Sequence, residues 1–413
     1  MFDLEKTGQN AKKMSKYVAR LKSHEKNVLL SACAEALIKN SEYILKENQK
    51  DMDNSDPKKA AFNDRLKLTP QRIASMAEGL RKVAGLDDPV HEVLYMKTLA
   101  NGLQIGERRV PLGVVGMIYE ARPNVTVDAF GLCFKSGNSC ILRGGSEAIN
   151  SNIALVSVLQ DALAALGHPR EFVQFISDTS REVAHAFMGL SKYVDVLIPR
   201  GSARLINSVL EHAKIPVIET GVGNCHIFVD ESAGLENAVK IVINAKVQRP
   251  GVCNSCEKVL VHKAVADTFL PVLCSALSEA GVEIRGDDKV CKVFAKAIPA
   301  SEEDWYSEFL DLIIGIKVID SFDRAVDHIN HYSSGHSDVI LTESYDKAHR
   351  FIADIDSAAV YVNASSRFTD GEEFGLGAEI GISTQKLHAR GPMGLKALTT
   401  SKFIVFGNGQ IRE

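Results

Sequence analysis

Short apolar segments alternate with longer amphipathic ones from about residue 110 onward, and this alternation constrains the fold more than any other feature of the chain. The short segments have the length of buried strands, and the stretches between them have the helical period. The strand candidates are 114–118, 140–142, 194–199, 216–219, 226–229, 258–261, 316–318, 338–341 and 359–362. The helical stretches include 149–166, 203–213, 234–246, 264–280 and 345–354. Such alternation predicts an α/β fold with parallel sheets covered by helices.

Three other segments do not follow the alternation. Residues 9–50 carry apolar side chains near the helical period, which predicts long helices. Residues 97–112 predict a hairpin around Asn101-Gly102, and 402–407 resemble a strand without a neighbour. A hairpin and a lone strand can pair across subunits or within one chain, and both alternatives stay open. A chain of 413 residues predicts two or three domains.

Composition and charge give no sign of a nucleic-acid or membrane partner. The net charge is −4 and the isoelectric point is near 6.3. No apolar run approaches the ~20 residues that cross a bilayer, and the first residues are charged, unlike a secretory leader. Eight cysteines without a framework spacing fit reduced thiols. We therefore expect a cytoplasmic protein whose thiols are available for chemistry.

Cys253 is the strongest catalytic candidate, because it lies in a turn-rich break between a predicted helix and a predicted strand. Arg249 precedes it, a proline and a glycine prevent the helix from continuing, and Asn254 follows. Cys253 and Cys256 also form a C-x-x-C pair, which suits a redox dithiol or half a zinc site. The remaining cysteines supply no second closely spaced pair of ligands, so we favour a single nucleophile at Cys253 and no metal.

Several strand candidates end in polar or glycine-rich turns, where open α/β sheets gather ligands. These turns carry Arg122 and Asn124, then Arg143, Gly145 and Ser146, then Arg200, Gly201 and Ser202, and finally Glu219 and Gly221. An amide such as that of Asn124 can stabilise an oxyanion, and small residues let a phosphate or ribose approach the backbone. Each charge also has an ordinary interpretation as a solvated side chain at a strand end. Neither G-x-G-x-x-G nor a Walker A loop is present, so any nucleotide must be bound without the usual loop.

The order of these motifs resembles the aldehyde dehydrogenase superfamily over nearly the whole chain. Within it, residues 119–126, 248–254, 361–370 and 383–394 closely match the glutamate-5-semialdehyde dehydrogenase family of proline biosynthesis. The resemblance implies two Rossmann-like domains and a small oligomerisation hairpin, and hence a homo-oligomer. It assigns residues 1–221 to NADP binding and 222–388 to the cysteine, while 389–413 return to the cofactor and oligomerisation region.

The resemblance also implies an oxidoreductase. NADPH would reduce L-glutamyl 5-phosphate to glutamate 5-semialdehyde, with release of phosphate, through a thioester on Cys253. Glu308 roughly matches the carboxylate that holds the nicotinamide ribose. Arg143 stands where relatives place a lysine beside the adenosine ribose, and Gly145 and Ser146 leave room for a 2′-phosphate.

The remaining implied roles concern the oxyanion, the base and the substrate. Asn124 and the Cys253 backbone N–H would stabilise the oxyanion. Glu219 aligns with the general base of oxidising relatives, although a reductase has no hydrolytic water to activate. The cationic and polar candidates for the substrate's phosphate and carboxylate are Arg122, Arg249, Asn254, His388 and Arg390. A glutamate 5-kinase is a further candidate partner. The rival interpretations are another aldehyde or acyl-phosphate dehydrogenase on this fold, and a non-enzymatic scaffold.

Overall fold

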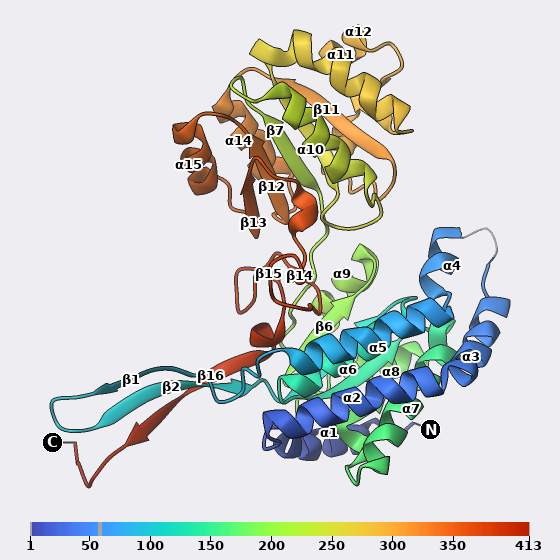
Figure 1. The fold of residues 1–413 in the computed structure, drawn as a ribbon, viewed down its shortest axis with the longest axis vertical. Coiled ribbons are helices and arrows are strands. Elements are labelled where there is room, and N and C mark those ends of the chain that lie inside the picture. Colours follow the sequence, from blue (N-terminus) through green and yellow to red (C-terminus); the bar gives the residue numbers. More distant parts are fainter. Residues whose placement is uncertain (1, 57–59, 413) are drawn as a thin grey trace. The chain divides into compact units, whose positions relative to one another are not determined.

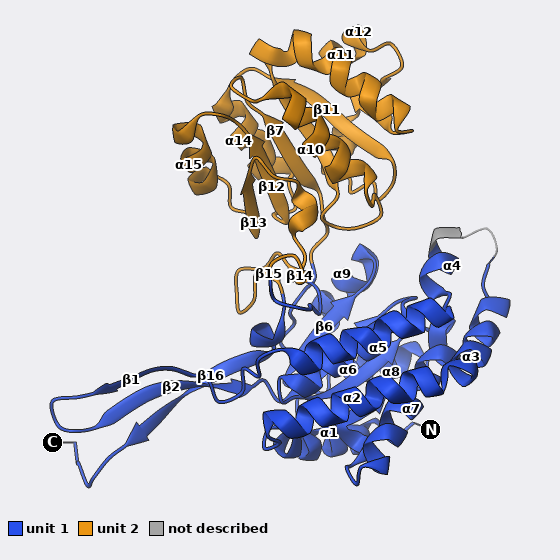
Figure 2. Ribbon diagram, viewed as in Figure 1, with its two compact units in different colours: residues 1–220, 375–381, 393–413 blue, residues 221–374, 382–392 orange. Residues whose placement is uncertain are grey.

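The computed structural model describes residues 2–56 and 60–412, and the chain forms two compact units with separate sheets (Figure 1, Figure 2). Unit 1 comprises residues 1–220, 375–381 and 393–413, and unit 2 comprises residues 221–374 and 382–392. The sequence interpretation placed boundaries after residues 221 and 388. The structure differs from it in the C-terminal part, where 375–381 packs with unit 1 and 389–392 with unit 2.

Unit 1 is built on a parallel four-stranded sheet in the order β5-β4-β3-β6. Its central strand β3 is buried along its whole length, as expected for a parallel strand covered on both faces. The predicted strand at 216–219 forms only a single parallel bridge from Val217 to Leu197, beside β6. The strands are β3 (Val114–Tyr119), β4 (Ser139–Gly144), β5 (Val173–Phe175) and β6 (Val196–Arg200).

Helices surround this sheet. The helical region predicted at 9–50 is three helices in the structure, because the chain leaves the helical path at 19–22 and at Asn40. The helices of unit 1 are α1 (Leu4–Val18), α2 (Ser23–Lys39), α3 (Ser41–Asp53), α4 (Ala60–Leu66), α5 (Pro70–Gly85), α6 (Pro123–Lys135), α7 (Ile149–Ala165), α8 (Arg181–Met188) and α9 (Ala203–His212), with short turns η1 (Ser146–Ala148), η2 (Arg170–Phe172) and η4 (Leu395–Leu398).

The helical stretch Ser146–Ala165 is long and apolar enough, by length and composition alone, to cross a membrane. Half of that apolar window is buried, and α7 packs against α2 and α3 within unit 1. Its buried side chains include the polar Ser151 and Asn152, which accept hydrogen bonds from Asn48 of α3 and Thr126 of α6. This is the pattern of a core helix.

A three-stranded antiparallel sheet extends from unit 1 (Figure 1). The hairpin predicted at 97–112 is β1 (Val93–Thr98) and β2 (Gln104–Pro111), and Gly102 takes the positive φ of +84° that its tight turn needs. The lone C-terminal strand is β16 (Thr399–Phe406), which pairs with β2 of the same chain along its full length. The C-terminal strand therefore pairs within its own chain.

Unit 2 has a seven-stranded parallel sheet in the order β10-β9-β11-β8-β7-β12-β13. Alternate residues of β7 and β8 enter two cores, one under α10 and α11 and the other under α14 and α15. The strands are β7 (Cys225–Val229), β8 (Cys256–His262), β9 (Glu283–Gly286), β10 (Ile298–Pro299), β11 (Ile313–Ile319), β12 (Ser337–Leu341) and β13 (Ala359–Val362). The helices are α10 (Leu235–Val247), α11 (Lys263–Glu279), α12 (Asp288–Val293), α13 (Glu302–Tyr306), α14 (Phe322–Tyr332) and α15 (Tyr345–Asp354), with the turn η3 (Ser366–Phe368) and the short pair β14 (Ile382–Ser383) and β15 (Gly391–Pro392).

Candidate active site

Cys253 lies in the turn that connects α10 to β8 in unit 2, where the Ser255 N–H donates to the Val252 carbonyl at 3.0 Å. Its side chain is partly exposed, whereas Cys256, the first residue of β8, is completely buried. Burial raises the pKa of Cys256 to about 12, so this thiol stays neutral near pH 7 and is a poor nucleophile. The two cysteines of the C-x-x-C pair therefore have very different environments, and only Cys253 is accessible.

The backbone of the cysteine turn packs tightly against the segment that precedes β7. The Cys225 thiol donates a hydrogen bond to the Cys253 carbonyl at 3.2 Å. Gly223 lies against the same peptide, and a Cβ at Gly223 would be 1.6 Å from the Cys253 carbonyl oxygen. The Gly223 N–H in turn donates to Glu308 Oε1 at 2.8 Å. Glu308, predicted from the sequence as a cofactor ligand, is thus connected to the nucleophile candidate through one residue, Gly223.

Asn254 is 4% exposed, and its side chain is engaged within the fold. The amide donates to the Thr369 carbonyl at 2.9 Å and to the Arg367 carbonyl at 3.3 Å, while its oxygen accepts from the Arg367 guanidinium. The Ser366 hydroxyl donates to the Asn254 carbonyl at 2.7 Å. These bonds tie the cysteine turn to η3, so Asn254 orients the turn in this structure.

Two arginines lie beside the cysteine turn. Arg249 is exposed, and Arg367 is half-buried with its Nε donating to Gln248 Oε1 at 2.9 Å. Burial lowers the pKa of Arg367, the nearby Arg249 charge lowers it further, and Cys253 opposes this effect. Arg367 is therefore within electrostatic reach of both Arg249 and Cys253. Arg367 was not singled out in the sequence, although it stands in the quoted motif 361–370.

Glu308 precedes β11 and is half-buried. Burial raises its pKa, and the Gly223 N–H opposes this by stabilising the charged form. Glu308 Oε2 makes no hydrogen bond among the residues that the structure describes. One carboxylate oxygen is therefore used by the fold, and the other can accept a hydroxyl of a ligand.

In unit 1, Arg143 at the end of β4 is half-buried and donates to the Thr179 and Ser180 carbonyls at 3.2 and 3.1 Å. Burial lowers its pKa. Its Nε is buried without a hydrogen-bond partner within the described part of the chain. The space at Gly145, which the sequence interpretation left open for a phosphate, holds the Glu147 carboxylate, 2.2 Å from where a Cβ would lie. Ser146 follows in η1.

A carboxylate of the protein already occupies the helix N-terminus that follows β6. Ser202 caps α9, and its N–H and hydroxyl donate to Glu120 at 2.7 and 3.0 Å. Glu120 also lies within 2.5 Å of a Cβ built on Gly201. The donors that the sequence offered to a ligand anion are thus used internally. Arg200 instead packs beside Gly381.

The other unit 1 candidates lie around the start of α6 and after β6. Arg122 is the N-cap residue of α6, and the Asn124 amide donates to Asp128 Oδ2 at 3.0 Å on the same helix. Glu219 is half-buried at the end of unit 1, while Cys253 belongs to unit 2. Gly221 begins unit 2, where its N–H donates to the Ile382 carbonyl at 2.9 Å.

The C-terminal cations of unit 2 gather around Asp356. Arg390 pairs with this carboxylate at 2.9 Å, and Lys386 also forms an ion pair with it. Both cations lower the pKa of Asp356. His388 lies between them in sequence, exposed and with a positive φ of 68°. Asp356 therefore neutralises part of the charge that the sequence suggested for substrate binding.

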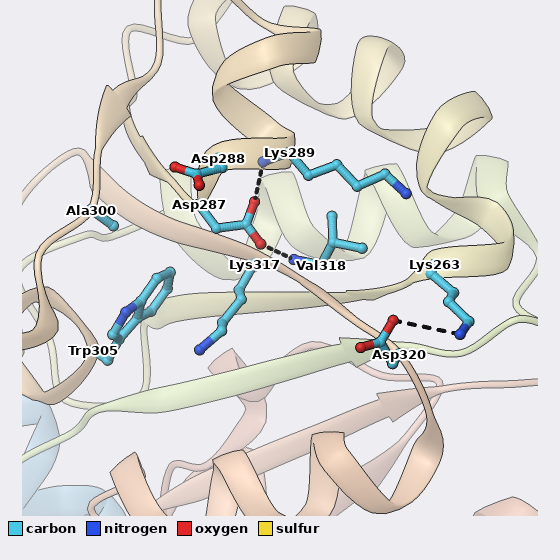
Figure 3. Close-up of a pocket in the computed structure, with 9 residues that line it drawn as sticks. All are labelled: Lys263, Asp287, Asp288, Lys289, Ala300, Trp305, Lys317, Val318 and Asp320. Atoms are coloured by element: carbon cyan, nitrogen blue, oxygen red, sulfur yellow. Dashed lines mark hydrogen bonds and ion pairs between the residues drawn. The ribbon is translucent and has the colours of Figure 1, made fainter.

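An open cavity of about 530 Å³ lies at the carboxyl ends of β8, β9 and β11 (Figure 3). The cysteine turn precedes β8, at the other end of that strand. Figure 3 shows the Asp287 carboxylate held by the backbone N–H groups of Lys289 and Val318. None of the predicted site residues lines it. Its lining consists of Lys263, Asp287, Asp288, Lys289, Ala300, Trp305, Lys317, Val318 and Asp320. Among the described residues, no group of three or more His, Cys, Asp or Glu side chains is arranged to hold a metal ion.

The chain combines two units built on parallel sheets, and one of them carries a partly exposed cysteine in the turn before β8. The sequence profile of the aldehyde dehydrogenase family matches residues 2–291. The chain therefore belongs to the aldehyde dehydrogenase family, and the predicted fold class is confirmed. An acetylating aldehyde dehydrogenase from Geobacillus thermoglucosidasius shares the fold at 14% identity, with a TM-score of 0.70 over 99% of this chain and 97% of that one.

More similar proteins share one name. A gamma-glutamyl phosphate reductase from Caldicellulosiruptor saccharolyticus is 57% identical over 419 residues, covering 100% of both chains. One from Lachnospira eligens is 54% identical over 415 residues, again covering 100% of both. The crystal structure of gamma-glutamyl phosphate reductase from Thermotoga maritima has a TM-score of 0.97 at 48% identity, with 100% of both chains covered. These matches confirm the resemblance found in the sequence motifs.

Proposed function

We propose that this protein reduces L-glutamyl 5-phosphate to L-glutamate 5-semialdehyde with NADPH, a step of proline biosynthesis. The observation that carries the proposal is the partly exposed Cys253, which follows Arg249 in the same turn and whose neighbour Asn254 accepts a hydrogen bond from Arg367. Arginines near the cysteine turn suit the phosphate of an acyl phosphate. The names of the full-length relatives support this substrate.

The chemistry at the thiol balances as two substitutions. The Cys253 thiolate attacks the acyl carbon, a carbon–sulfur bond forms, and the carbon–oxygen bond to phosphate breaks with phosphate leaving as the anion. The Cys253 backbone N–H and the Asn124 amide are proposed to stabilise the developing oxyanion, an effect of about 3 kcal/mol per donor. Bound NADPH supplies the hydride that converts the thioester to the aldehyde, which releases the thiolate.

The cofactor suits the residues that would hold it. Arg143 has a buried Nε without a partner among the described residues, and Glu308 Oε2 can accept a ribose hydroxyl. We therefore assign Arg143 to the adenosine end, beside Gly145 and Ser146, and Glu308 to the nicotinamide ribose. The Glu147 carboxylate, which also accepts the Ala121 N–H at 2.6 Å, opposes a 2′-phosphate at this place.

The remaining assignments follow from how each side chain is used. Arg249 and Arg367 are proposed to bind the phosphate, and Arg122, His388 and Arg390 to serve the substrate's carboxylate. We propose that the cofactor is bordered by Arg200, Gly201, Ser202 and Gly221. The cofactor does not displace the Glu120 carboxylate from the N-terminus of α9. Asn254 is proposed to orient the cysteine turn. Glu219 receives no step, because the reduction activates no water.

The three-stranded sheet is proposed to join copies of this chain. Large apolar side chains are exposed on both faces of this sheet. A water-soluble monomer rarely exposes so many neighbouring apolar side chains. They are Val93, Leu94, Tyr95, Met96, Phe403, Val405 and Phe406. A homo-oligomer that covers them is therefore part of the proposal, as are a cytoplasmic location and a glutamate 5-kinase that supplies the labile acyl phosphate.

The test compares two alanine variants in the reverse direction, NADP-dependent oxidation of glutamate 5-semialdehyde with phosphate. Cys253→Ala should abolish turnover, whereas Cys256→Ala should retain most of it. Wild-type activity that requires no phosphate, or that prefers simple aldehydes, would point to another dehydrogenase on this fold. Turnover by Cys253→Ala would exclude the covalent mechanism.

A further inference from the structure

Three charged side chains are buried together behind the cysteine turn. Lys246 near the end of α10 and the neighbouring Glu257 and Lys258 on β8 all have no exposed surface. Removing such groups from water costs several kcal/mol per ion unless partners compensate. Burial raises the pKa of Glu257 to about 7 and lowers that of Lys258 to about 8, while their attraction opposes both shifts. A cluster with such a desolvation penalty indicates a role that apolar side chains could not fulfil.

A β-bulge directs these charges to one place. Cys225 pairs with Cys256, but His226 pairs with Lys258, so Glu257 is an extra residue in β8. Consecutive strand residues normally point to opposite faces. Here Glu257 and Lys258 both reach the segment 307–310, because the bulge turns the Glu257 side chain.

The contacts hold this segment from its buried side. Lys246 pairs with Glu257 at 3.1 Å, and Glu257 accepts from the N–H groups of Phe309 and Leu310 at 3.3 and 3.4 Å. Lys258 donates to the Ser307 carbonyl at 2.7 Å, with its ammonium 4.2 Å from the centre of the Phe309 ring. The Ser307 carbonyl before Glu308 and the Phe309 N–H after it are therefore each held by a side chain of β8.

The segment holds a backbone conformation that it would not keep unaided. Leu310 has a φ of 55°, in the left-handed region that a residue with a Cβ atom avoids at a cost of about 1 kcal/mol or more. Its N–H is one of the two groups that Glu257 accepts. Such strain persists where the surroundings over-determine the backbone.

We propose that Lys246, Glu257 and Lys258 form a positioning network that fixes segment 307–310. The network holds the Glu308 carboxylate where it accepts the Gly223 N–H, beside Cys253, and where it can bind the cofactor ribose. The proposal rests on the proposed function for the ribose contact. The contact with Gly223 is independent of the cofactor, since Glu308 Oε1 already accepts the Gly223 N–H at 2.8 Å. Glu257 is thus a positioning residue that touches neither substrate nor cofactor.

Two double variants separate positioning from mere stability. Lys246→Met with Glu257→Gln removes both charges but keeps one acceptor oxygen, which can replace one of the two carboxylate oxygens that bind the Phe309 and Leu310 N–H groups. Lys246→Met with Glu257→Leu removes the charges and that acceptor. Both variants lack the ion pair, so they differ in the hydrogen bonds that position 257 can accept from segment 307–310. Lys240→Met, which breaks the exposed pair with Glu236 on the same helix, is the matched control.

The readouts are the KM for NADPH, kcat, and the rate of Cys253 alkylation by iodoacetamide without cofactor. We expect the Gln variant, which keeps one of the two acceptors, to stay within a few-fold of wild type, and the Leu variant to show about ten-fold higher KM and a several-fold changed alkylation rate. Emission from Trp305, the chain's one tryptophan, reports folding of unit 2. If the Leu variant does not fold, Lys258→Met releases the Ser307 carbonyl instead and is expected to raise KM in the same way.

Equal KM and equal alkylation rates for the two double variants would overturn the network. A wild-type protein that neither binds NADPH nor turns over would instead overturn the proposed function. In that case the alkylation comparison still decides the network, because it needs no cofactor. The two failures are therefore distinguishable.

Discussion

The α-carbon of Gly223 lies against the peptide of Cys253 so closely that a Cβ there would be 1.6 Å from the Cys253 carbonyl oxygen and 2.5 Å from its α-carbon. No rotation of a side chain can relieve this, because the obstructing atoms are backbone. The position of the nucleophile is therefore fixed by the absence of a side chain 30 residues earlier.

Gly223→Ala should displace the cysteine turn and lower kcat by about a hundred-fold, since a shift near 1 Å at a reacting atom has that effect. The measurement is kcat in the reverse reaction, with Trp305 emission to verify folding. Gly85→Ala is the control, because a Cβ there has no atom within 4 Å. An active Gly223→Ala variant would mean that the turn adapts.

Arg367→Lys should raise the KM for inorganic phosphate in the reverse reaction about ten-fold. A lysine keeps the charge but loses the fork that binds two phosphate oxygens, and it cannot also reach Gln248 and Asn254. Arg350→Lys, on the exposed surface of α15, should change nothing. A rise in the KM for the semialdehyde alone would show that Arg367 contacts the carboxylate instead.

The sequence predicted much of the fold because buried parallel strands leave a local signal. The segment 114–118 corresponds to β3, whose residues are all buried, and 258–261 lies within β8. The strand Glu283–Gly286 escaped notice, because only alternate residues are buried and it carries charged side chains. The end of β16 was found, but its partner was not, since strand pairing joins residues about 300 positions apart.

The candidate site was predictable only where its signal is local. The turn around Cys253 is visible in seven consecutive residues, whereas Glu120 meets Ser202 across 82 positions. Spacing along the chain shows which residues follow a strand, but not which donors another side chain already uses. Glu120 and Asp356 both neutralise groups that the sequence offered to ligands, and Glu147 fills the space at Gly145.

Arg143→Gln should raise the KM for NADPH about ten-fold or more and leave that for NADH nearly unchanged, because a charge-assisted contact to the 2′-phosphate is lost. Glu147→Gln should act in the opposite direction, since it removes a nearby negative charge while keeping an acceptor for the Ala121 N–H. Arg170→Gln, at an exposed site in η2, is the control. Parallel losses for both cofactors would place Arg143 away from the 2′-phosphate.

Phe403→Asp with Val405→Asp should dissociate the oligomer. These side chains are 67% and 56% exposed on β16, and they share one face of the sheet with Tyr95 and Ile105 by register. A buried charge at such an interface is strongly unfavourable. Sedimentation velocity measures the change, and Ile411→Asp beyond the strand is the control. A monomeric wild type would contradict the proposed use of this sheet.

His336→Asn should make unit 2 less sensitive to acid. His336 is completely buried with its Nε2 lacking a partner within the described residues, and burial lowers its pKa to about 4. The folded protein therefore binds fewer protons at this site than the unfolded chain, whose histidine titrates near 6.5. The stabilising contribution is complete above pH 6.5 and is lost as the pH falls toward 4.

The expected change is in the slope of unfolding free energy against pH, by up to about 1.4 kcal/mol per pH unit between pH 6.5 and 4. Denaturant titrations followed by Trp305 emission give this slope for unit 2. Asp338 acts in the opposite sense, because burial raises its pKa to about 6, so its contribution is lost as the pH rises. The absolute slope therefore mixes these two groups with other buried groups of unit 2, such as His328 and Glu257, and only the difference between variant and wild type isolates His336. Equal slopes for the variant and the wild type across this range would show that His336 is protonated in the folded protein as it is in the unfolded chain.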